Sequence, residues 1–245
     1  MKALWRALLR LFGIPARGAS DERAAFGAAG GKDRAMLSTL SLEEFAGRLA
    51  AATPTPGGGS AAALAGSLSA SLLRMVCNLT LGRERYKAHE EAVGVIRKRA
   101  ESLQKDLMVL VDRDAQAYDK VVEARRLPKE TAAEQEIRRA ALSRANLFAT
   151  ETPMATAEAC AALMLLAIEL AHKGNVNAVS DVGSAALLAY AGLRAGVMNV
   201  RINLGGLDDQ ERAAKARDRV RRLEIDAERF REEALAAVFS RMNDR

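Results

Sequence analysis

Apolar residues recur every three to four positions from residue 41 almost to the end of the chain, which is the spacing of amphipathic helices. The alternation of apolar and polar residues that marks a strand is not developed anywhere in this region. Glycines, prolines and polar stretches divide the pattern into about seven helices, expected near 41–49, 60–82, 83–126, 130–150, 153–173, 180–204 and 208–242. The sequence therefore predicts an all-α, multi-helical bundle that forms a single domain over residues 39–245.

Several of these boundaries carry local signals. Ser41 and Glu44 have the spacing of a capping box. Pro153 is expected to open a new helix, because proline suits a first turn and disrupts a helix interior. The segment 60–82 is long enough to be mistaken for a membrane span, but Arg74 interrupts it and its Ala, Gly and Ser content is only mildly apolar. We expect a buried central helix there.

Residues 1–38 differ in kind from the rest. Residues 2–12 have the pattern of a basic amphipathic helix that is too short to span a bilayer, and residues 13–32 form a linker rich in Gly and Ala. The apolar side of this helix could make a weak contact with a membrane surface or with a partner. We favour a simpler explanation of the segment, a mobile extension or a start codon upstream of the natural one.

Composition narrows the class of protein. Aromatic residues make up only 4% of the 245 residues and alanine is abundant, which favours close packing of helices through small side chains. The formal charge is +6, but residues 1–36 hold seven basic and three acidic residues, so the body is nearly neutral and nucleic acid is not an expected partner. Cys77 and Cys160 lie in apolar helical stretches, so we expect buried free thiols and a cytoplasmic protein. His89 and His172 have no ligand-spaced partners, so no metal site is expected.

The most distinctive local feature is a turn at residues 53–60, Thr-Pro-Thr-Pro-Gly-Gly-Gly-Ser, which leads into a helix. Glycines permit positive φ and close backbone approach, while the first amides of a helix lack intrahelical acceptors and attract negative charge. Ser60 is followed by Ala rather than by the Lys-Ser/Thr of a nucleotide-binding P-loop, and no strand precedes the glycines as a dinucleotide fingerprint requires. A simple turn between helices is the alternative.

The long helix at 83–126 contains one carboxylate in its apolar stripe. Its core-facing positions follow a three-four spacing, and Asp114 falls where an apolar residue is expected; the stripe consists of Ile96, Ala100, Leu103, Leu107, Leu110, Tyr118 and Val121. A carboxylate among apolar side chains must be paired, hydrogen-bonded or raised in pKa, and each outcome suits a general acid or base. The alternative is a structural hydrogen bond to a neighbouring helix, with Tyr118 one turn away as a candidate partner.

Three polar residues of the 180–204 region are further candidates. Asp181 stands where a helix N-cap is favoured, and capping alone would explain it. Asn199 and Asn203 share a face with Gly192 and Gly196, where their amides could read the edge of a heterocycle or tie closely packed helices together. The helix rise places Asp181 roughly 27 Å from Asn199, so the two cannot contact one reacting atom within a single chain.

Two sets of residues carry a family resemblance. The first is Pro-Gly-Gly-Gly-Ser at 56–60, and the second is Gly-Asn-Val-Asn-Ala-Val-Ser-Asp at 174–181, followed by the alanine-rich 185–189 and by Asn-Val-Arg-Ile-Asn-Leu at 199–204. Together they resemble the cyclodeaminase/cyclohydrolase family of folate enzymes. That family includes the cyclodeaminase half of formiminotransferase-cyclodeaminase and stand-alone methenyltetrahydrofolate cyclohydrolases. The resemblance covers about residues 40–242.

The resemblance implies an enzyme that acts on a C–N bond at the one-carbon bridge of tetrahydrofolate. It implies Asp114 and Asp181 as catalytic residues, a homodimer with ligand at or near the interface, and no cofactor beyond the tetrahydrofolate derivative itself. The substrate-binding residues that it implies are Pro56, Gly57, Gly58, Gly59, Ser60, Asn175, Ser180, Asn199 and Asn203. Since no formiminotransferase domain accompanies the chain, we expect a methenyltetrahydrofolate cyclohydrolase, with formiminotetrahydrofolate cyclodeaminase, an ammonia-lyase, as the alternative.

Basic residues near these motifs fit the glutamate tail of a folate, and the candidates are Arg83, Arg85, Lys87 and Lys173. Each of them also suits a solvated surface position. A function of another class stays open as well, namely a non-enzymatic helical module that binds a partner, in which the glycine turn and Asp114 would be purely structural.

Overall fold

The computed structural model describes residues 36–243, and residues 1–35 and 244–245 lie outside the described part. Almost all of the expected N-terminal segment, residues 1–38, therefore lies outside the described residues. The described chain contains six α-helices: α3 (Leu42–Ala50), α4 (Gly58–Thr80), α5 (Glu90–Arg126), α6 (Ala132–Lys173), α7 (Val179–Asn203) and α8 (Gln210–Asn243). Short 3-10 turns lie at Leu37–Thr39, Glu84–His89, Val176–Ala178 and Leu204–Gly206. The prediction of an all-α, single-domain bundle is confirmed.

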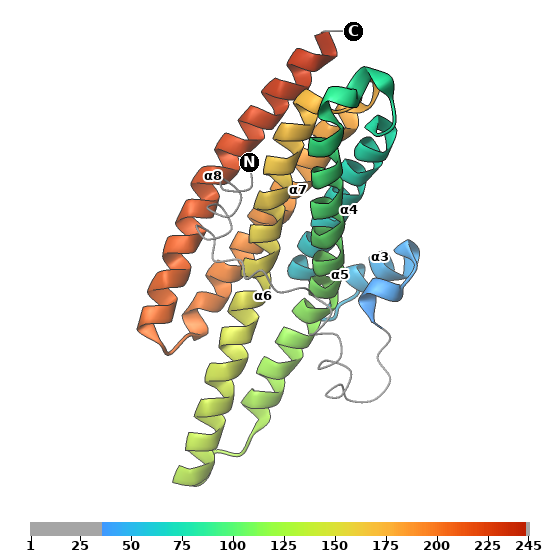
Figure 1. Cartoon of the computed structure of the whole chain (residues 1–245). Helices are drawn as coiled ribbons and strands as arrows, with labels where there is room; N and C mark the ends of the chain where they lie inside the picture. Colours follow the sequence, from blue (N-terminus) through green and yellow to red (C-terminus); the bar gives the residue numbers. More distant parts are fainter. Residues whose placement is uncertain (1–35, 244–245) are drawn as a thin grey trace.

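The long helices form two layers. Helices α4 and α7 pack side by side in one layer, and α5 and α6 pack side by side in the other. Between the layers α4 contacts α5 and α6 contacts α7, and α8 packs against both α6 and α7. Helices α5 and α6 form a hairpin whose tip runs beyond the ends of the neighbouring helices, and the small α3 lies to one side of the bundle (Figure 1). This arrangement brings the start of α4, the middle of α5 and the end of α7 together at one level of the bundle.

One helix boundary was predicted wrongly. We expected separate helices at 130–150 and from Pro153, whereas α6 is one continuous helix of 42 residues with Pro153 inside it. Proline lacks an N–H, so the carbonyl of Ala149 four residues earlier loses its intrahelical partner. In the structure the side-chain amide of Asn203 donates to that carbonyl at 2.6 Å. A residue of α7 thus replaces the hydrogen bond that Pro153 removes, and the helix continues.

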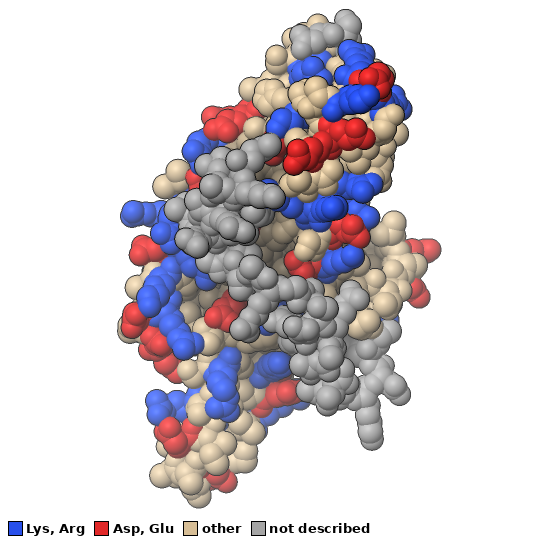
Figure 2. Space-filling model, viewed as in Figure 1, with Lys and Arg blue, Asp and Glu red and all other residues tan. Residues whose placement is uncertain are grey.

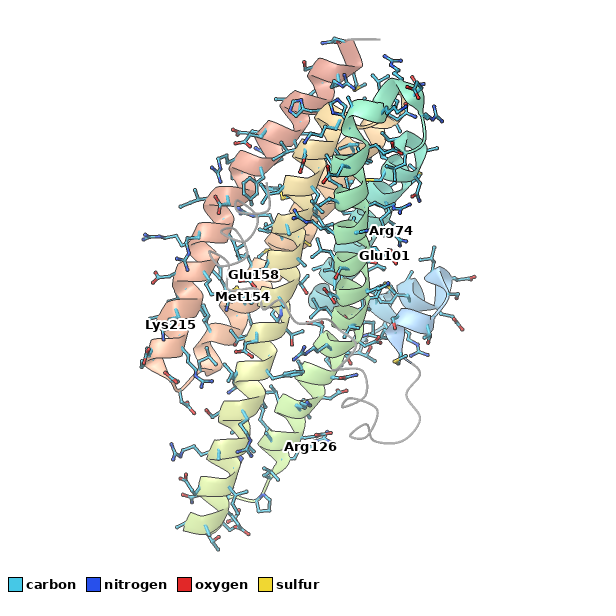
Figure 3. The ribbon with its side chains drawn as sticks, viewed as in Figure 1. Arg74, Glu101, Arg126, Met154, Glu158 and Lys215 are labelled. Atoms are coloured by element: carbon cyan, nitrogen blue, oxygen red, sulfur yellow. The ribbon has the colours of Figure 1, made fainter. Side chains whose placement is uncertain are left out.

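Other boundary signals act as expected. Ser41 and Glu44 form a reciprocal capping box at the start of α3, and Thr131 and Glu134 form a second one at the start of α6. Cys77 and Cys160 are buried free thiols, as predicted, and burial raises the pKa of each thiol to about 12. Arg74, which interrupts the apolar run of α4, donates to Gln104 of α5 and lies beside Glu101 (Figure 3).

Small residues let the helices of the core approach closely. Glycines on α4 and α7, Gly66 and Gly192, meet at the Sγ of Cys160 on α6, where an added Cβ would lie 2.7 and 2.8 Å from the sulfur. An ion pair joins α6 to α8, in which the buried Glu158 of α6 accepts from the half-buried Arg219 of α8. Glu158 lies on the side of α6 that faces α8 (Figure 3). The low aromatic content of the chain is therefore matched by packing through alanine and glycine.

Three helical segments of the described chain are long and apolar enough to cross a membrane by length and composition: Gly58–Thr80, Ala132–Lys173 and Val176–Gly206. In each case more than half of the most apolar window is buried inside the bundle, with 56%, 78% and 56% respectively. The apolar residues of α4 thus serve mainly the packing of helices, which agrees with the buried central helix that we expected. On the face shown in Figure 2, basic and acidic side chains are interspersed.

Candidate active site

The glycine turn delivers the chain into α4 as the sequence predicts. The Thr55–Pro56 peptide bond is cis, Gly57 is the N-cap, and α4 begins at Gly58. Of the two properties that glycine offers here, positive φ is not used, because among the described glycines only Gly82 has one, at 74°. The turn uses glycine for close approach instead: a Cβ at position 59 would lie 2.7 Å from Oδ2 of Asp114 and closer still to its Oδ1 and Cγ.

Asp114 of α5 occupies the space that Gly59 leaves open. Its Oδ2 accepts a hydrogen bond from the main-chain N–H of Ser60 at 2.8 Å and another from the Ser60 hydroxyl at 3.1 Å. The same hydroxyl lies 2.9 Å from the carbonyl of Val111 on α5. The sequence predicts that an anion docks at this helix start, and in the structure a carboxylate of the chain itself, that of Asp114, lies there.

The environment of Asp114 favours its neutral form. Burial raises the pKa of this carboxyl above its ordinary value of 3.8, and the hydrogen bonds from Ser60 oppose that rise without cancelling it. No cation takes part in the shift. A carboxyl whose pKa is raised is a stronger base than an ordinary aspartate, and this direction of shift suits a general acid or base.

Two details of the expected stripe on α5 are wrong. Tyr118 is 42% exposed and lies outside the core, and the hydrogen-bond partner of Asp114 is Ser60 rather than Tyr118. Beyond Val111 the buried residues of α5 are all small: Ala115, Ala117 and Ala124. The buried face of α5 thus no longer follows the predicted stripe after Asp114.

Asn199 also borders the glycine turn. A Cβ at Gly58 would lie 3.6 Å from its Nδ2, and this amide donates at 2.8 Å to the carbonyl of Ala195 one turn earlier. No residue of the described part of the chain donates a hydrogen bond to its Oδ1, which is therefore the atom available to a ligand. The site assembled within one chain is therefore the Gly57–Ser60 turn, Asp114 and Asn199.

Asn203 has the structural role that was the alternative to ligand binding. Its amide donates to the carbonyl freed by Pro153, and Gly196 on the same helix packs where a Cβ would lie 2.9 Å from the Pro153 carbonyl. These contacts fix α7 against the bend of α6. Asn203 thereby helps to position Asn199, which lies one helical turn earlier and borders the glycine turn.

Asn175 lies at the opposite end of the bundle. It is buried, its Nδ2 donates to the carbonyl of Leu79 at 3.0 Å, and its N–H donates to the hydroxyl of Thr80 at 2.9 Å. The hydroxyl of Tyr86 lies 3.4 Å from its Oδ1 and accepts from the N–H of Val176 at 3.1 Å. Sequence reasoning missed Tyr86, and the only available signal was the rarity of aromatic residues. Thr80 is 22 residues from Gly58, or roughly 33 Å along α4, so Asn175 is remote from the glycine turn of its own chain.

Asp181 and Ser180 belong to this second end. The prediction that Asp181 caps the helix is wrong, because α7 begins at Val179 with Ala178 as its N-cap and without a side-chain cap hydrogen bond. Asp181 instead lies half-buried in the first turn, and Ser180 is exposed. Since capping does not account for Asp181, its carboxylate is available for another role.

The expected tail-binding residues lie at the same far end. Lys87 forms an exposed pair with Glu84, Lys173 is held by Glu169 at 2.5 Å, and Arg83 precedes the 3-10 turn at Glu84–His89. The structure therefore brings the predicted residues together in two groups at opposite ends of α4 and α7, and it does not join these groups within one chain. No cluster of three His, Cys, Asp or Glu side chains that could hold a metal occurs within residues 36–243.

The fold and this geometry define a helical bundle in which a half-buried carboxyl group, that of Asp114, is held at a helix start built from glycines. Comparison with known proteins identifies the class. The family model for formiminotransferase-cyclodeaminase matches residues 41–222, which is more than half of the chain. The chain therefore belongs to the formiminotransferase-cyclodeaminase family, as the motifs at 56–60 and 174–181 suggested.

Individual relatives support this assignment. The chain is 41% identical over 189 residues to methenyltetrahydrofolate cyclohydrolase of Methylorubrum extorquens, covering 77% of this chain and 89% of that protein. It is 33% identical over 190 residues to formimidoyltransferase-cyclodeaminase of Mus musculus, of which it spans 35%. The crystal structure of formiminotetrahydrofolate cyclodeaminase from Thermotoga maritima matches with a TM-score of 0.73 at 27% identity, over 83% of this chain and 98% of that one. All three relatives bear the names of enzymes, so the interpretation as a non-enzymatic binding module is not supported.

Proposed function

We propose that the protein is a methenyltetrahydrofolate cyclohydrolase. The observation that carries this proposal is the carboxyl of Asp114, half-buried at the glycine turn with its pKa raised and with no cation of residues 36–243 acting on it, in a chain that aligns with nearly the whole length of a relative of that name. The glycine turn leaves an approach to the first amides of α4, and the side-chain amide of Asn199 borders Gly58 in the same region. A flat, positively charged ring system fits beside a carboxylate in such a place.

The proposed reaction adds water to the methenyl carbon. Asp114 accepts a proton from the attacking water as the C–O bond forms, and the same carboxyl then returns a proton to the ring nitrogen as its C–N bond breaks. The adduct's hydroxyl proton leaves as the formyl carbonyl forms, so the reaction releases one proton in total and changes no oxidation state. The proposed chemistry therefore calls for no redox cofactor, and the tetrahydrofolate derivative is the only carrier.

Formiminotetrahydrofolate cyclodeaminase is the second candidate. The Thermotoga structure bears this name, and the same carboxyl could serve by protonating the departing ammonia while the ring closes. Turnover of methenyl- and formiminotetrahydrofolate should be measured side by side with wild-type protein and with Asp114→Asn. Hydrolysis of the methenyl substrate that the variant loses would support the proposal, whereas deamination alone would replace it by the second candidate, and turnover of neither would reject both.

We further propose that the active unit is a homodimer, formed across α4 and α7. Both helices expose large apolar side chains: Leu68, Met75 and Leu79 on α4, and Leu187, Met198 and Ile202 on α7. Residues 68, 75 and 79 and residues 187, 198 and 202 fall on the three-four spacing of a helix-packing seam. A second copy of the chain is the occupant that this surface suits, because the two separated groups of site residues lie at its two ends.

An antiparallel pairing explains the separation of Asp181 from Asn199. If two copies pack about a two-fold axis near the middle of α4 and α7, the Asp181 end of one copy meets the glycine turn of the other. Mixing inactive Asp114→Asn and Asp181→Asn variants tests this directly. Up to about a quarter of wild-type activity should return, since a random mixture holds half heterodimers and each has one intact site. Mixtures that stay inactive, or a monomer that is active in sedimentation experiments, would contradict the composite site.

A further inference from the structure

The hydroxyl of Ser60 lies between two hydrogen-bond acceptors of α5. Its Oγ is 2.9 Å from the carbonyl oxygen of Val111 and 3.1 Å from Oδ2 of Asp114. A hydroxyl has one proton to donate, and this one lies in a side chain whose residue is 0% exposed, so bulk water does not compete for it. The single proton must therefore serve either the carbonyl or the carboxyl.

The two oxygens of Asp114 have different surroundings. Oδ2 accepts at 2.8 Å from the main-chain N–H of Ser60, a group that can only donate, so Oδ2 has to remain an acceptor whether or not the carboxyl is ionised. Within residues 36–243 no group donates to Oδ1, which occupies the space that a Cβ at Gly59 would fill. The geometry therefore leaves Oδ1 as the oxygen that can hold a proton.

The charge of the carboxyl decides which acceptor the hydroxyl of Ser60 favours. When Asp114 is ionised, Oδ2 is negatively charged and accepts more strongly than a neutral carbonyl does. When Oδ1 holds a proton, Oδ2 is itself a neutral carbonyl oxygen, and the nearer Val111 carbonyl becomes the better acceptor. Rotation about the Cβ–Oγ bond of Ser60 is enough to exchange the two hydrogen bonds.

No charged side chain of the described residues shares this influence on Asp114. The pKa of its carboxyl is shifted by burial and by the two hydrogen bonds from Ser60. Between the glycine turn and Arg74 the helix α4 has no charged residue. Charged residues in neighbouring turns of α5, α6 and α7 have other partners or are exposed: Arg113 lies over the ring of Phe148, Asp112 accepts from the N–H of Ser38, Arg201 pairs with Glu224, and Glu151 is exposed.

We propose that Oδ1 is the oxygen of Asp114 that takes up and returns the catalytic proton, and that the hydroxyl of Ser60 turns to Val111 when Oδ1 is protonated and to Oδ2 when it is not. This inference rests on the proposed role of Asp114 in the reaction. Ser60 acts through Asp114 and is thus a positioning residue. Its hydroxyl stabilises the ionised carboxylate, so it holds the pKa of Asp114 below the value that burial alone would give.

Ser60→Ala tests this role, because it removes the hydroxyl and keeps the main-chain N–H. The loss of a hydrogen bond to the ionised form should raise the pKa of Asp114 by about one unit. The rise of kcat/KM with pH should therefore move to higher pH by the same amount, which lowers kcat/KM about tenfold on the acidic side of the profile. Ser69→Ala is the matched control: Ser69 is a residue of the same helix, is 0% exposed, and its hydroxyl has no partner among the described residues. This variant should leave the profile unchanged.

Infrared titration of the carboxyl separates this proposal from the proposed reaction, because it needs no turnover. Subtracting the spectrum of Asp114→Asn identifies the C=O band of protonated Asp114. In the wild type this band should have the lowered frequency of a hydrogen-bonded carbonyl, since Oδ2 accepts from the N–H of Ser60. A band at the higher frequency of a carbonyl without a donor would place the proton on Oδ2 and overturn the proposal.

The same titration follows the effect of Ser60. The band should persist to a pH about one unit higher in Ser60→Ala than in the wild type, because the ionised form has lost a donor. This shift without any turnover would reject the proposed reaction and still support the link between Ser60 and Asp114. Equal midpoints in the wild type and Ser60→Ala, or an equal shift in Ser69→Ala, would overturn the proposal even in an active enzyme.

Discussion

Gly59→Ala is the sharpest test of the proposed site, because it adds one methyl group against a single side chain. The Cβ of alanine would lie 2.7 Å from Oδ2 of Asp114 and closer to Oδ1, far inside the contact distance of carbon and oxygen. The carboxyl must therefore move by an ångström or so, which takes Oδ2 away from the N–H of Ser60, now at 2.8 Å. The mutation thus displaces Asp114 without changing its chemistry.

The expected magnitudes differ for turnover and stability. Displacing a general acid or base costs about 10²–10⁴-fold in rate, so turnover of methenyltetrahydrofolate should fall by that factor. Leaving the N–H of Ser60 without its acceptor costs about 1–3 kcal/mol, and replacing glycine by alanine in a helix returns up to about 1 kcal/mol. The free energy of unfolding should therefore fall by at most about 3 kcal/mol.

Gly58→Ala is the matched control, since its Cβ would meet only the Nδ2 of Asn199 at an ordinary 3.6 Å. The assay pairs turnover with denaturant unfolding for both variants and for Gly59→Ala in an Asp114→Asn background. If Gly59→Ala acts through Asp114, the double variant should be no slower than Asp114→Asn alone. A folded Gly59→Ala protein with near-normal turnover would refute the assignment of Asp114, and equal losses in both glycine variants would show that the turn is needed for folding only.

Further predictions concern charge, pH and packing. Asp114→Asn should lower turnover by about 10²–10⁴-fold while thermal melting at neutral pH stays level or rises, because the buried charge is removed; a melting point lowered by many degrees would indicate a structural carboxylate. Because burial raises the pKa of Asp114, the folded state holds its proton to higher pH than the unfolded state does. The stability of the wild type relative to this variant should therefore decline as pH rises from 3.8 through the raised pKa, and kcat/KM should rise over the same range, which paired unfolding and pH-rate profiles would show. Asn203→Leu should destabilise the protein by about 1–3 kcal/mol in denaturant unfolding, since the Ala149 carbonyl loses its donor. Deleting residues 1–35 should leave kcat/KM unchanged, as no site residue lies there.

The sequence predicts most of the fold because the fold is built from long, regular helices. A three-four spacing of apolar residues survives over most of each helix, and caps such as Ser41–Glu44 mark its start. The same spacing singled out Asp114, because a carboxylate at an apolar position of the stripe can be recognised from the sequence alone. It misplaced Tyr118, which is 42% exposed, because the apolar spacing does not record which neighbour lies beside each turn of a long helix.

The site was harder to predict than the fold, because its residues act through contacts far apart in the chain. The glycines at 57–59 suggested either unusual φ or close approach, and only the position of Asp114, 55 residues after Gly59, decides for close approach. Likewise the motif predicts that Asn175 binds ligand, and the structure adds that its hydrogen bonds tie the end of α4 to the loop before α7. A motif indicates that its residues act together, but it does not tell whether they bind a ligand or form contacts with one another.

Pro153 and Asn203 show how such a tie serves the site. Local rules end a helix at Pro153, since its ring removes a donor and crowds the preceding turn. The amide of Asn203 supplies the missing donor, so α6 continues past the bend and α7 is fixed against it. Asn199 stands one turn from this contact and beside Gly58, so the hydrogen bond that keeps α6 whole also sets the position of the amide that faces the proposed ligand. The two asparagines, which the sequence suggested as a pair that binds a heterocycle, therefore have different contacts. Asn203 joins α7 to α6, and Asn199 borders the glycine turn.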